Sequence, residues 1–254
     1  MRLESPDEQL ARAVGLWRLV TVGTTQWPAD RDALGRAVPR EITRAPRDGD
    51  TLGISWSGAL QHAVKHLPKL PHNDIVQLAG ALRTDDTTEN ESPRLFAELR
   101  SRTAWPLWAP LVVDQAAALK KSPEIDVALR RADPLDVAVL AIGGWSPDTS
   151  TVWPRVSEDL ARAAARAGEV AEVPASSLTS PATSWTLQSR GWSSRRASRS
   201  CARPTTGSGS PRERNGPPPS SPRCGGLVSH LVCDTALRDE VEQLLRASAP
   251  PRED

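Results

Sequence analysis

The sequence has few types of aromatic residue and little lysine. Tyrosine is absent, phenylalanine occurs once, and tryptophan occurs nine times in 254 residues. Basic charge comes mostly from arginine, and alanine and proline are abundant. This usage indicates a gene rich in G and C, which matters for an unusual internal segment, residues 174–226.

Long apolar runs, a strong net charge and paired cysteines are also lacking. The longest apolar runs, such as 137–142, are far shorter than the ~20 residues that cross a bilayer. The N-terminus turns acidic at Glu4 and lacks the apolar stretch of a signal peptide. A net charge of +1 provides no general attraction to nucleic acid or to acidic membranes. The three cysteines show neither metal-ligand spacing nor a disulfide framework, so we expect a cytoplasmic protein without metal or cofactor.

Short apolar segments alternate with stretches of helical periodicity along most of the chain. The segments are apolar throughout, as expected of strands covered on both faces, and helices of 10 to 15 residues separate them. This pattern predicts an α/β fold with a Rossmann-like, mostly parallel sheet and helices on both faces. The predicted strands are 16–22, 51–55, 74–78, a piece before Pro106, 136–142 and 227–233. The predicted helices are 6–15, 28–43 (interrupted or ended near Pro39), 57–66, 91–100, one opened by Asp114, 157–167, and 235–247 capped by Asp234 or Thr235.

The composition changes abruptly at residues 174–226. These 53 residues include 13 serines, 8 arginines, 8 prolines and 6 glycines, and neither valine nor isoleucine. With one acid, Glu213, the segment carries +7, while the rest of the chain carries −6 (24 basic against 30 acidic residues). Such a segment cannot bury enough apolar area to offset its ordering entropy. We therefore divide the chain into a first part (1–173), this low-complexity segment, and a closing strand and helix (227–247) of the same domain.

Three interpretations of the segment 174–226 remain open. It is a disordered basic linker, an arginine- and serine-rich arm that binds nucleic acid, or a stretch translated out of frame between two compensating errors. We favour the third interpretation because a G- and C-rich gene yields serine, arginine, proline and glycine when it is misread, and because both edges are sharp.

Five motifs follow one another in a recognisable order. They are 48–56 (Asp-Gly-Asp-Thr-Leu-Gly-Ile-Ser-Trp), 76–80 (Val-Gln-Leu-Ala-Gly), 106–114 (Pro-Leu-Trp-Ala-Pro-Leu-Val-Val-Asp), 136–146 (Asp-Val-Ala-Val-Leu-Ala-Ile-Gly-Gly-Trp-Ser) and 225–234 (Gly-Gly-Leu-Val-Ser-His-Leu-Val-Cys-Asp). Together they resemble the sugar-binding, or effector, domain of the SorC/DeoR-type bacterial transcriptional regulators, over about 5–173 and 225–245. The interval between these parts is about as long as the family's own, but its chemistry is unrelated.

The resemblance implies that the chain binds a sugar or sugar-phosphate effector as the sensor domain of a transcriptional regulator. Such regulators usually begin with a helix-turn-helix domain, and this chain begins just past where that domain would end. We therefore expect a truncated sensor with no direct DNA binding and no membrane partner. Formation of a homo-oligomer is left open.

The resemblance also implies a ligand site beyond the carboxyl ends of the strands, where helix N-termini present free N–H groups. The best candidate is the loop after strand 51–55, the second is the loop after strand 136–142, and the third follows strand 74–78. The candidate ligand-binding residues are Gly53, Ser55, Trp56, Ser57, Gly58, Gln77, Gly80, Gly143, Gly144, Ser146 and Asp234.

Simpler interpretations stand beside these assignments. A glycine after a strand is more often only part of a turn, and Trp56 is either core or a stacking platform for a sugar. His62 and His66 have the spacing of two metal ligands but no evident third, which favours a solvated helix face. Asp234 is more typical of a helix cap. Ala59 stands where the family commonly has threonine, which favours an unphosphorylated sugar or a degraded pocket.

Two other functions remain open. One is a sugar-phosphate isomerase-like enzyme, which would need a base beside the substrate carbon. No carboxylate or lysine is clearly set in a glycine-rich loop, so we expect no enzymatic activity. The other is a degraded, non-functional product.

The out-of-frame interpretation predicts what the gene encodes in its other reading frames across residues 174–226. We expect one alternative frame to restore an apolar strand and an alanine-rich helix. Translation of the nucleotide sequence in all frames tests this directly. If every frame is as poor in aliphatic residues as the present one, the linker interpretation gains instead.

Overall fold

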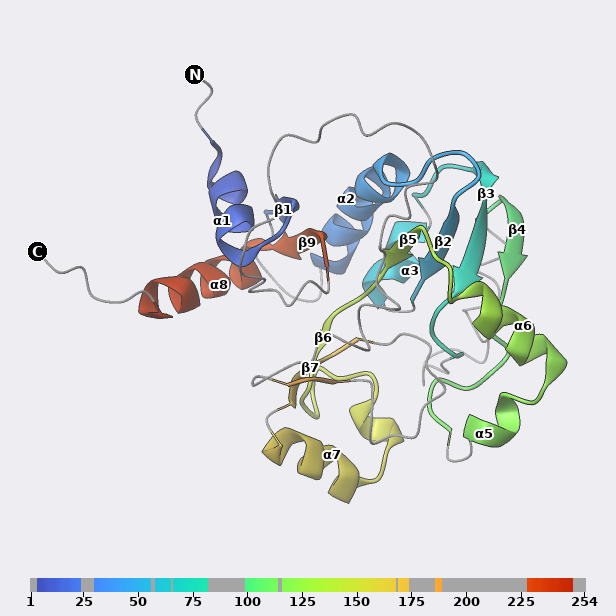
Figure 1. Cartoon of the computed structure of the whole chain (residues 1–254). Helices are drawn as coiled ribbons and strands as arrows, with labels where there is room; N and C mark the ends of the chain where they lie inside the picture. Colours follow the sequence, from blue (N-terminus) through green and yellow to red (C-terminus); the bar gives the residue numbers. More distant parts are fainter. Residues whose placement is uncertain are drawn as a thin grey trace, which may run out of the picture.

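The computed structural model describes residues 4–23, 30–55, 58–64, 66–81, 99–113, 116–167, 169–173, 186–188 and 228–248. Several sequence predictions lie outside these ranges: most of helix 91–100, the residues Trp56 and Ser57, and all of segment 174–226 except three residues. The elements, shown in Figure 1, are α1 (Pro6–Val14), β1 (Arg18–Val22), α2 (Asp30–Arg44), β2 (Thr51–Ile54), α3 (Gly58–Val64), β3 (Leu70–Gln77), β4 (Ser101–Trp105), α5 (Ala116–Leu119), α6 (Pro123–Arg131), β5 (Val137–Val139), β6 (Gly143–Gly144), the 3-10 helix η1 (Trp153–Arg155), α7 (Glu158–Arg166), β7 (Glu169–Glu172), β8 (Thr186–Gln188), β9 (His230–Asp234) and α8 (Thr235–Ser248).

The main sheet has four strands in the order β4-β3-β2-β5, and all of its pairings are parallel. In the register of β2, Ile54 pairs with Gln77 of β3 and with Val139 of β5. Among the described residues, α3 lies between β2 and β3, and α5 and α6 lie between β4 and β5. The predicted α/β fold with a mostly parallel sheet is confirmed.

Apolar side chains cover both faces of the main sheet. Leu52, Ile54 and Ile75 point to the face that packs on α2 and α3 through residues such as Ile42 and Leu60. The alternate residues Val76 and Leu78 point to the other face and pack against Leu135, which follows α6. Because successive strand residues face opposite sides, an apolar run without alternation requires cover on both faces, as here.

The structure corrects the prediction that the second helix breaks or ends near Pro39. Helix α2 continues through Pro39 to Arg44. Proline removes one backbone hydrogen bond, but Ile42, one turn later, is 5% exposed within the core. Helix α2 also packs closely on α3, since a Cβ added at Gly35 would lie 2.5 Å from Cβ of His62. Burial against the neighbouring helix therefore outweighs the local preference to end the helix.

The first and last described elements form a unit of their own at one end of the molecule (Figure 1). Strands β1 and β9 pair in parallel over Arg18↔His230 to Val22↔Asp234, although most of the chain separates them. Their core includes Leu10 and Val14 of α1 together with Cys233 of β9. Burial raises the pKa of the Cys233 thiol to about 11. The closing strand and helix thus belong to the same fold as the N-terminus.

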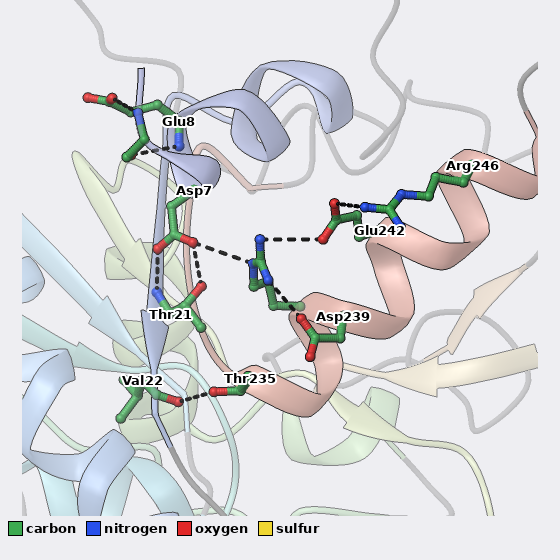
Figure 2. Close-up of polar contacts among 10 residues, drawn as sticks. Asp7, Glu8, Thr21, Val22, Thr235, Asp239, Glu242 and Arg246 are labelled. Atoms are coloured by element: carbon green, nitrogen blue, oxygen red, sulfur yellow. Dashed lines mark hydrogen bonds and ion pairs between the residues drawn. The ribbon is translucent and has the colours of Figure 1, made fainter. Parts of the chain in front are cut away.

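Polar contacts fasten α1 to β1 and α8 within this unit (Figure 2). The carboxylate of Asp7 accepts hydrogen bonds from the backbone N–H of Thr21 (3.0 Å) and from its hydroxyl (2.9 Å). Nε of Arg238 in α8 lies 3.7 Å from Oδ1 of Asp7, and Nη1 of Arg238 donates a hydrogen bond to Asp239 (2.8 Å). Asp7 therefore joins elements from the two ends of the chain.

Asp234 is the residue that caps α8. Its Oδ1 accepts a hydrogen bond from the backbone N–H of Leu237 at 2.7 Å. Thr235 instead donates its hydroxyl to the carbonyl of Val22 in β1 (3.3 Å). This geometry decides between the two caps that the sequence left open.

A third, small sheet has the order β6-β7-β8, and both of its pairings are antiparallel. Its edge strand β8, Thr186–Gln188, falls within the segment whose composition predicted no folded structure. Strand β7 supplies the pairing, and this partner is not visible in the local composition. None of the helices within the described parts of the chain is long and apolar enough to cross a membrane.

We predict that Asp7→Ala lowers the free energy of unfolding by about 1–3 kcal/mol, because it leaves the N–H and the hydroxyl of Thr21 without their acceptor and removes one ion-pair partner of Arg238. Urea denaturation of the full chain measures this loss. Asp239→Ala is the matched control, since it removes a half-exposed carboxylate from the same arginine and should cost less than about 1 kcal/mol. Equal losses in the two variants would contradict the linking role of Asp7.

Candidate functional site: the carboxyl edge of the main sheet

The carboxyl ends of the four parallel strands meet along one edge, which we call the rim: Ser55, residues 77–81, 105–111 and 140–153. Pairing of Ile54 with both Gln77 and Val139 places the ends of β2, β3 and β5 level with one another. The backbone N–H of Leu78 donates to the carbonyl of Ile54 (2.8 Å), which continues this contact past the strands. Ser55 and the segments that follow β3 and β5 therefore lie on one side of the sheet.

Ser55 fastens the end of β2 to the loop after β5. Its side chain is buried, and its Oγ accepts a hydrogen bond from the backbone N–H of Ala141 at 3.0 Å. Its own backbone N–H donates to the carbonyl of Val139 at 2.9 Å. Ser55 thus positions the chain that leads into Gly143.

Gln77 performs the same task between β3 and the segment after β4. The amide is 3% exposed; its Nε2 donates to the carbonyl of Ala79 (2.6 Å), and its Oε1 accepts from the N–H of Leu107 (3.2 Å). Both ends of the amide bind protein groups. In this structure Gln77 therefore holds the segment after β4 against the end of β3.

Two of the selected glycines are required by packing within the protein. A Cβ added at Gly80 would lie 2.3 Å from the carbonyl oxygen of Pro110, where Ala81 and Pro110 form a parallel bridge. A Cβ added at Gly53 would lie 2.5 Å from Cδ1 of Leu135 and 2.7 Å from Cδ1 of Leu78. The absence of a side chain at these positions allows the segments that contain Leu135 and Pro110 to lie close to the main-chain atoms of the two glycines.

The loop after β5 contributes Gly143, Gly144 and Ser146. The hydroxyls of Ser146 and Thr149 lie 2.7 Å apart, and Thr149 donates to the carbonyl of Gly144 at 3.1 Å. The N–H of Ser150 donates to the carbonyl of Ser146 at 3.0 Å, which closes a turn. Gly144 and Thr149 are exposed, so this turn presents backbone and hydroxyl groups to solvent.

Trp145 anchors that loop to the protein interior. Its indole N–H donates to the carbonyl of Ala161 in α7 (3.2 Å), and its ring lies 5.4 Å from the ring of Trp153, centroid to centroid. The side chain is 9% exposed. In the motif that ends in Gly-Gly-Trp-Ser, a buried tryptophan therefore anchors small residues that are half-buried or exposed.

Glu172 is a residue of this region that sequence reasoning missed. Its carboxylate is 1% exposed and accepts hydrogen bonds from the hydroxyl of Ser150 and from the N–H groups of Thr151 (2.7 Å) and Val152 (3.2 Å). In the sequence Glu172 stands two residues before the break at Pro174, where an acid suggests a solvated strand end. Only its pairing opposite Gly143 in the small sheet places it under the loop.

The remaining selected residues are not gathered at the rim to the same degree. Gly58 is the first residue of α3, directly beyond the end of β2. Asp234 ends β9 in the two-stranded terminal sheet, where its carboxylate caps α8. Within the described ranges no three histidine, cysteine or acidic side chains gather as a metal site would require, so His62 acquires no such partners there.

The first three residues of the signature 48–56, Asp48 to Asp50, lie at the opposite, amino edge of the main sheet. Gly49 has φ +95°, which makes it the left-handed residue of the predicted turn. The carboxylate of Asp50 accepts from the N–H of Arg47 (2.8 Å), and Asn73 donates to the carbonyl of Arg47 (2.6 Å). The acids of this motif therefore build a turn remote from the rim.

Comparison with known proteins adds a family and several similar folds. The sequence matches the family model described as "Putative sugar-binding domain" over residues 5–176. None of the curated proteins matches this chain.

Several solved structures share the fold at low sequence identity. A domain of a possible sugar-binding transcriptional regulator from Arthrobacter aurescens TC1 is 14% identical, with a TM-score of 0.66 over 95% of this chain and 100% of that one. A DeoR family transcriptional regulator from Listeria monocytogenes is 14% identical, with a TM-score of 0.64 over 92% of this chain and 97% of that one. The full-length sorbitol operon regulator SorC from Klebsiella pneumoniae is 18% identical, with a TM-score of 0.55 over 68% of this chain and 63% of that one.

We predict that the two rim glycines Gly80 and Gly144 tolerate alanine unequally. Gly80→Ala places its Cβ against a fixed backbone carbonyl, so we expect a loss of about 1–3 kcal/mol in the free energy of unfolding. In Gly144→Ala the nearest obstacle is the hydroxyl of Thr149, 2.7 Å away, which can rotate aside. Urea denaturation compares the two variants, with Gly23→Ala, where nothing lies within 4 Å of the added Cβ, as control. A larger loss for Gly144→Ala would contradict this assignment.

Proposed function

Because this chain belongs to the sugar-binding domain family, we propose that it binds a sugar or sugar phosphate as the effector of a SorC/DeoR-type transcriptional regulator. The single observation that carries the proposal is that the matched region, 5–176, contains every rim segment, and that its loops meet at one edge of the sheet. Ligands of open parallel α/β sheets bind at the carboxyl edge.

The groups offered by the rim suit a polyhydroxylated ligand. Gly144 and Thr149 are exposed, and Ser146 is half-buried with its hydroxyl 2.7 Å from that of Thr149. Hydroxyls and backbone groups both donate and accept, and a sugar needs partners of both kinds. The residues proposed for the site, by contact or by support, remain Gly53, Ser55, Trp56, Ser57, Gly58, Gln77, Gly80, Gly143, Gly144, Ser146 and Asp234. In this proposal, Ser55 and Gln77 act by holding the loops that contact the sugar.

Binding fits the rim better than catalysis does. An isomerase requires a base that is free to take a proton from the substrate carbon. The carboxylate of Glu172 lies under the rim loop, but it accepts three hydrogen bonds from protein groups and is 1% exposed. This occupancy argues against Glu172 as such a base.

In the proposed role, effector binding alters the affinity of a regulator for operator DNA. Such an effect is a coupling free energy between two sites. We place the effector site of that coupling at the rim. The terminal unit, which joins the two ends of the described chain through β1 and β9, is the element through which we expect the coupling to pass.

Thermal unfolding of the purified full chain tests the proposal. The probes are D-glucose, D-fructose, D-ribose and D-sorbitol, the terminal phosphate esters of each, and inorganic phosphate. A ligand present at 100 times its Kd stabilises the folded state by ~2.7 kcal/mol, so we expect at least one sugar or sugar phosphate to raise Tm by about 5–11 °C. The loss of the family threonine at Ala59 leads us to expect that unphosphorylated sugars bind at least as well as their phosphates.

A matched pair of serine variants locates the binding. Ser146→Ala removes a rim hydroxyl and should reduce the rise in Tm, whereas Ser101→Ala removes a hydroxyl at the amino end of β4 and should leave it unchanged. NMR of each sugar phosphate after incubation with the chain separates binding from isomerase activity, because binding alone leaves the compound unaltered. If no sugar or sugar phosphate raises Tm, or if Ser101→Ala reduces the rise as much as Ser146→Ala does, the proposal fails.

A further inference from the structure

Beneath the rim, within the described part of the chain, lies a buried carboxylate whose hydrogen-bond donors are all uncharged. Glu172 is 1% exposed, and burial of an ionised carboxylate is unfavourable unless hydrogen bonds replace its water. The replacement comes from one hydroxyl, Ser150, and two backbone N–H groups, Thr151 and Val152. All three donors lie in one loop, so the charge is compensated only while that loop keeps its shape.

The loop in question is 143–153, which we call the effector loop. Ser150 is the second part of its support: its Oγ accepts from the N–H of Val152 (3.1 Å) and from that of Trp153 (2.8 Å), while it donates to Glu172. These bonds satisfy the free N–H groups at the start of η1, as a helix cap does. Glu172 and Ser150 therefore fix the far end of the loop.

Glu172 also meets the near end of the loop. In the β6-β7 register Gly143 pairs with Glu172, and a Cβ added at Gly143 would lie 3.3 Å from Cγ and 3.3 Å from Oε1 of Glu172. One side chain is thus in contact with the first residue of the effector loop and bonded to its last turn. The exposed part of the loop, around Gly144 and Thr149, lies between these two points.

We propose that Glu172 is the positioning residue of the effector site, holding the effector loop 143–153 in its binding shape without itself touching the sugar. This inference rests on the proposed function, and it deepens that function by naming what preorganises the site. The carboxylate is 1% exposed and takes three hydrogen bonds from the loop above it, so a sugar at the surface could reach it only if that loop moved. A preformed loop lowers the ordering cost that binding would otherwise carry.

The test uses four variants of the full chain. Glu172→Gln keeps the size of the side chain but turns one acceptor into a donor that faces other donors. Ser150→Ala removes the hydroxyl that links Glu172 to η1, and Ser150→Thr restores a hydroxyl. Glu158→Gln, on the exposed face of α7 where Glu158 pairs with Arg162, is the matched control.

Hydrogen exchange without ligand is the first measurement. Amides of residues 145–156 should exchange at least 10-fold faster in Glu172→Gln and in Ser150→Ala than in the parent chain. Amides of β2 and β3 should change little, which shows that the variants remain folded. Protection should return in Ser150→Thr and be unaffected in Glu158→Gln. Unchanged exchange of 145–156 in Glu172→Gln would overturn the proposal.

Affinity is the second measurement, made with the panel compound that raises Tm of the parent chain most. Glu172→Gln should raise its Kd at least 10-fold, while the amides of β2 and β3 remain protected; Ser150→Thr should restore the affinity that Ser150→Ala loses. A loosened loop with an unchanged Kd would overturn the positioning role and leave the proposed function intact. If no panel compound binds the parent chain, the proposed function fails and this inference fails with it, while the exchange data still report the order of the loop.

Discussion

The parallel register of β2 with both of its neighbours is the constraint on which the rest of the structure depends. Ile54 pairs with Gln77 on one side and with Val139 on the other, so three strands end level. Parallel strands cannot be joined by tight turns, and each connection must return across a face of the sheet. The loops that leave β2, β3 and β5 are therefore forced onto one edge, and the amino-edge turn that contains Gly49 onto the other. The topology alone therefore makes the rim the place where we expect a ligand, before any side chain is considered.

Buried polar side chains then give the rim its shape. Ser55, Gln77 and Glu172 come from the ends of three different strands, and each accepts a backbone N–H from a loop remote in sequence. Each is nearly inaccessible to solvent, so the loss of such an acceptor would leave an unsatisfied buried donor. These buried side chains consequently fix the loops by hydrogen bonds, while the exposed residues of the loops remain available to a ligand. This division between support and contact is the main physical feature of the candidate site.

Much of the fold was predictable because its signals are local. Apolar runs without alternation indicated strands covered on both faces, and Ser157 and Asp234 occupy the cap positions that their residue types favour. The errors have tertiary causes. Helix α2 continues through Pro39 because Ile42 is buried beyond it, and β8 forms within an apparently structureless composition because β7 offers an edge to pair with. Glu172 was missed for the same reason, since nothing around it in sequence marks it as buried.

Patterns along the chain were enough to predict the α/β class, the strands of the main and terminal sheets, and small residues in the loops at the rim. Periodicity and residue type carry that information because each depends only on neighbours along the chain. The tertiary structure alone decided what those residues do. Gly53 and Gly80 are small because Leu135 and the Pro110 carbonyl lie against them, and Ser55 meets Ala141, 86 residues away. A hydrogen bond or a close approach across such an interval depends on how the sheet is assembled. Local patterns in the sequence do not specify such long-range contacts.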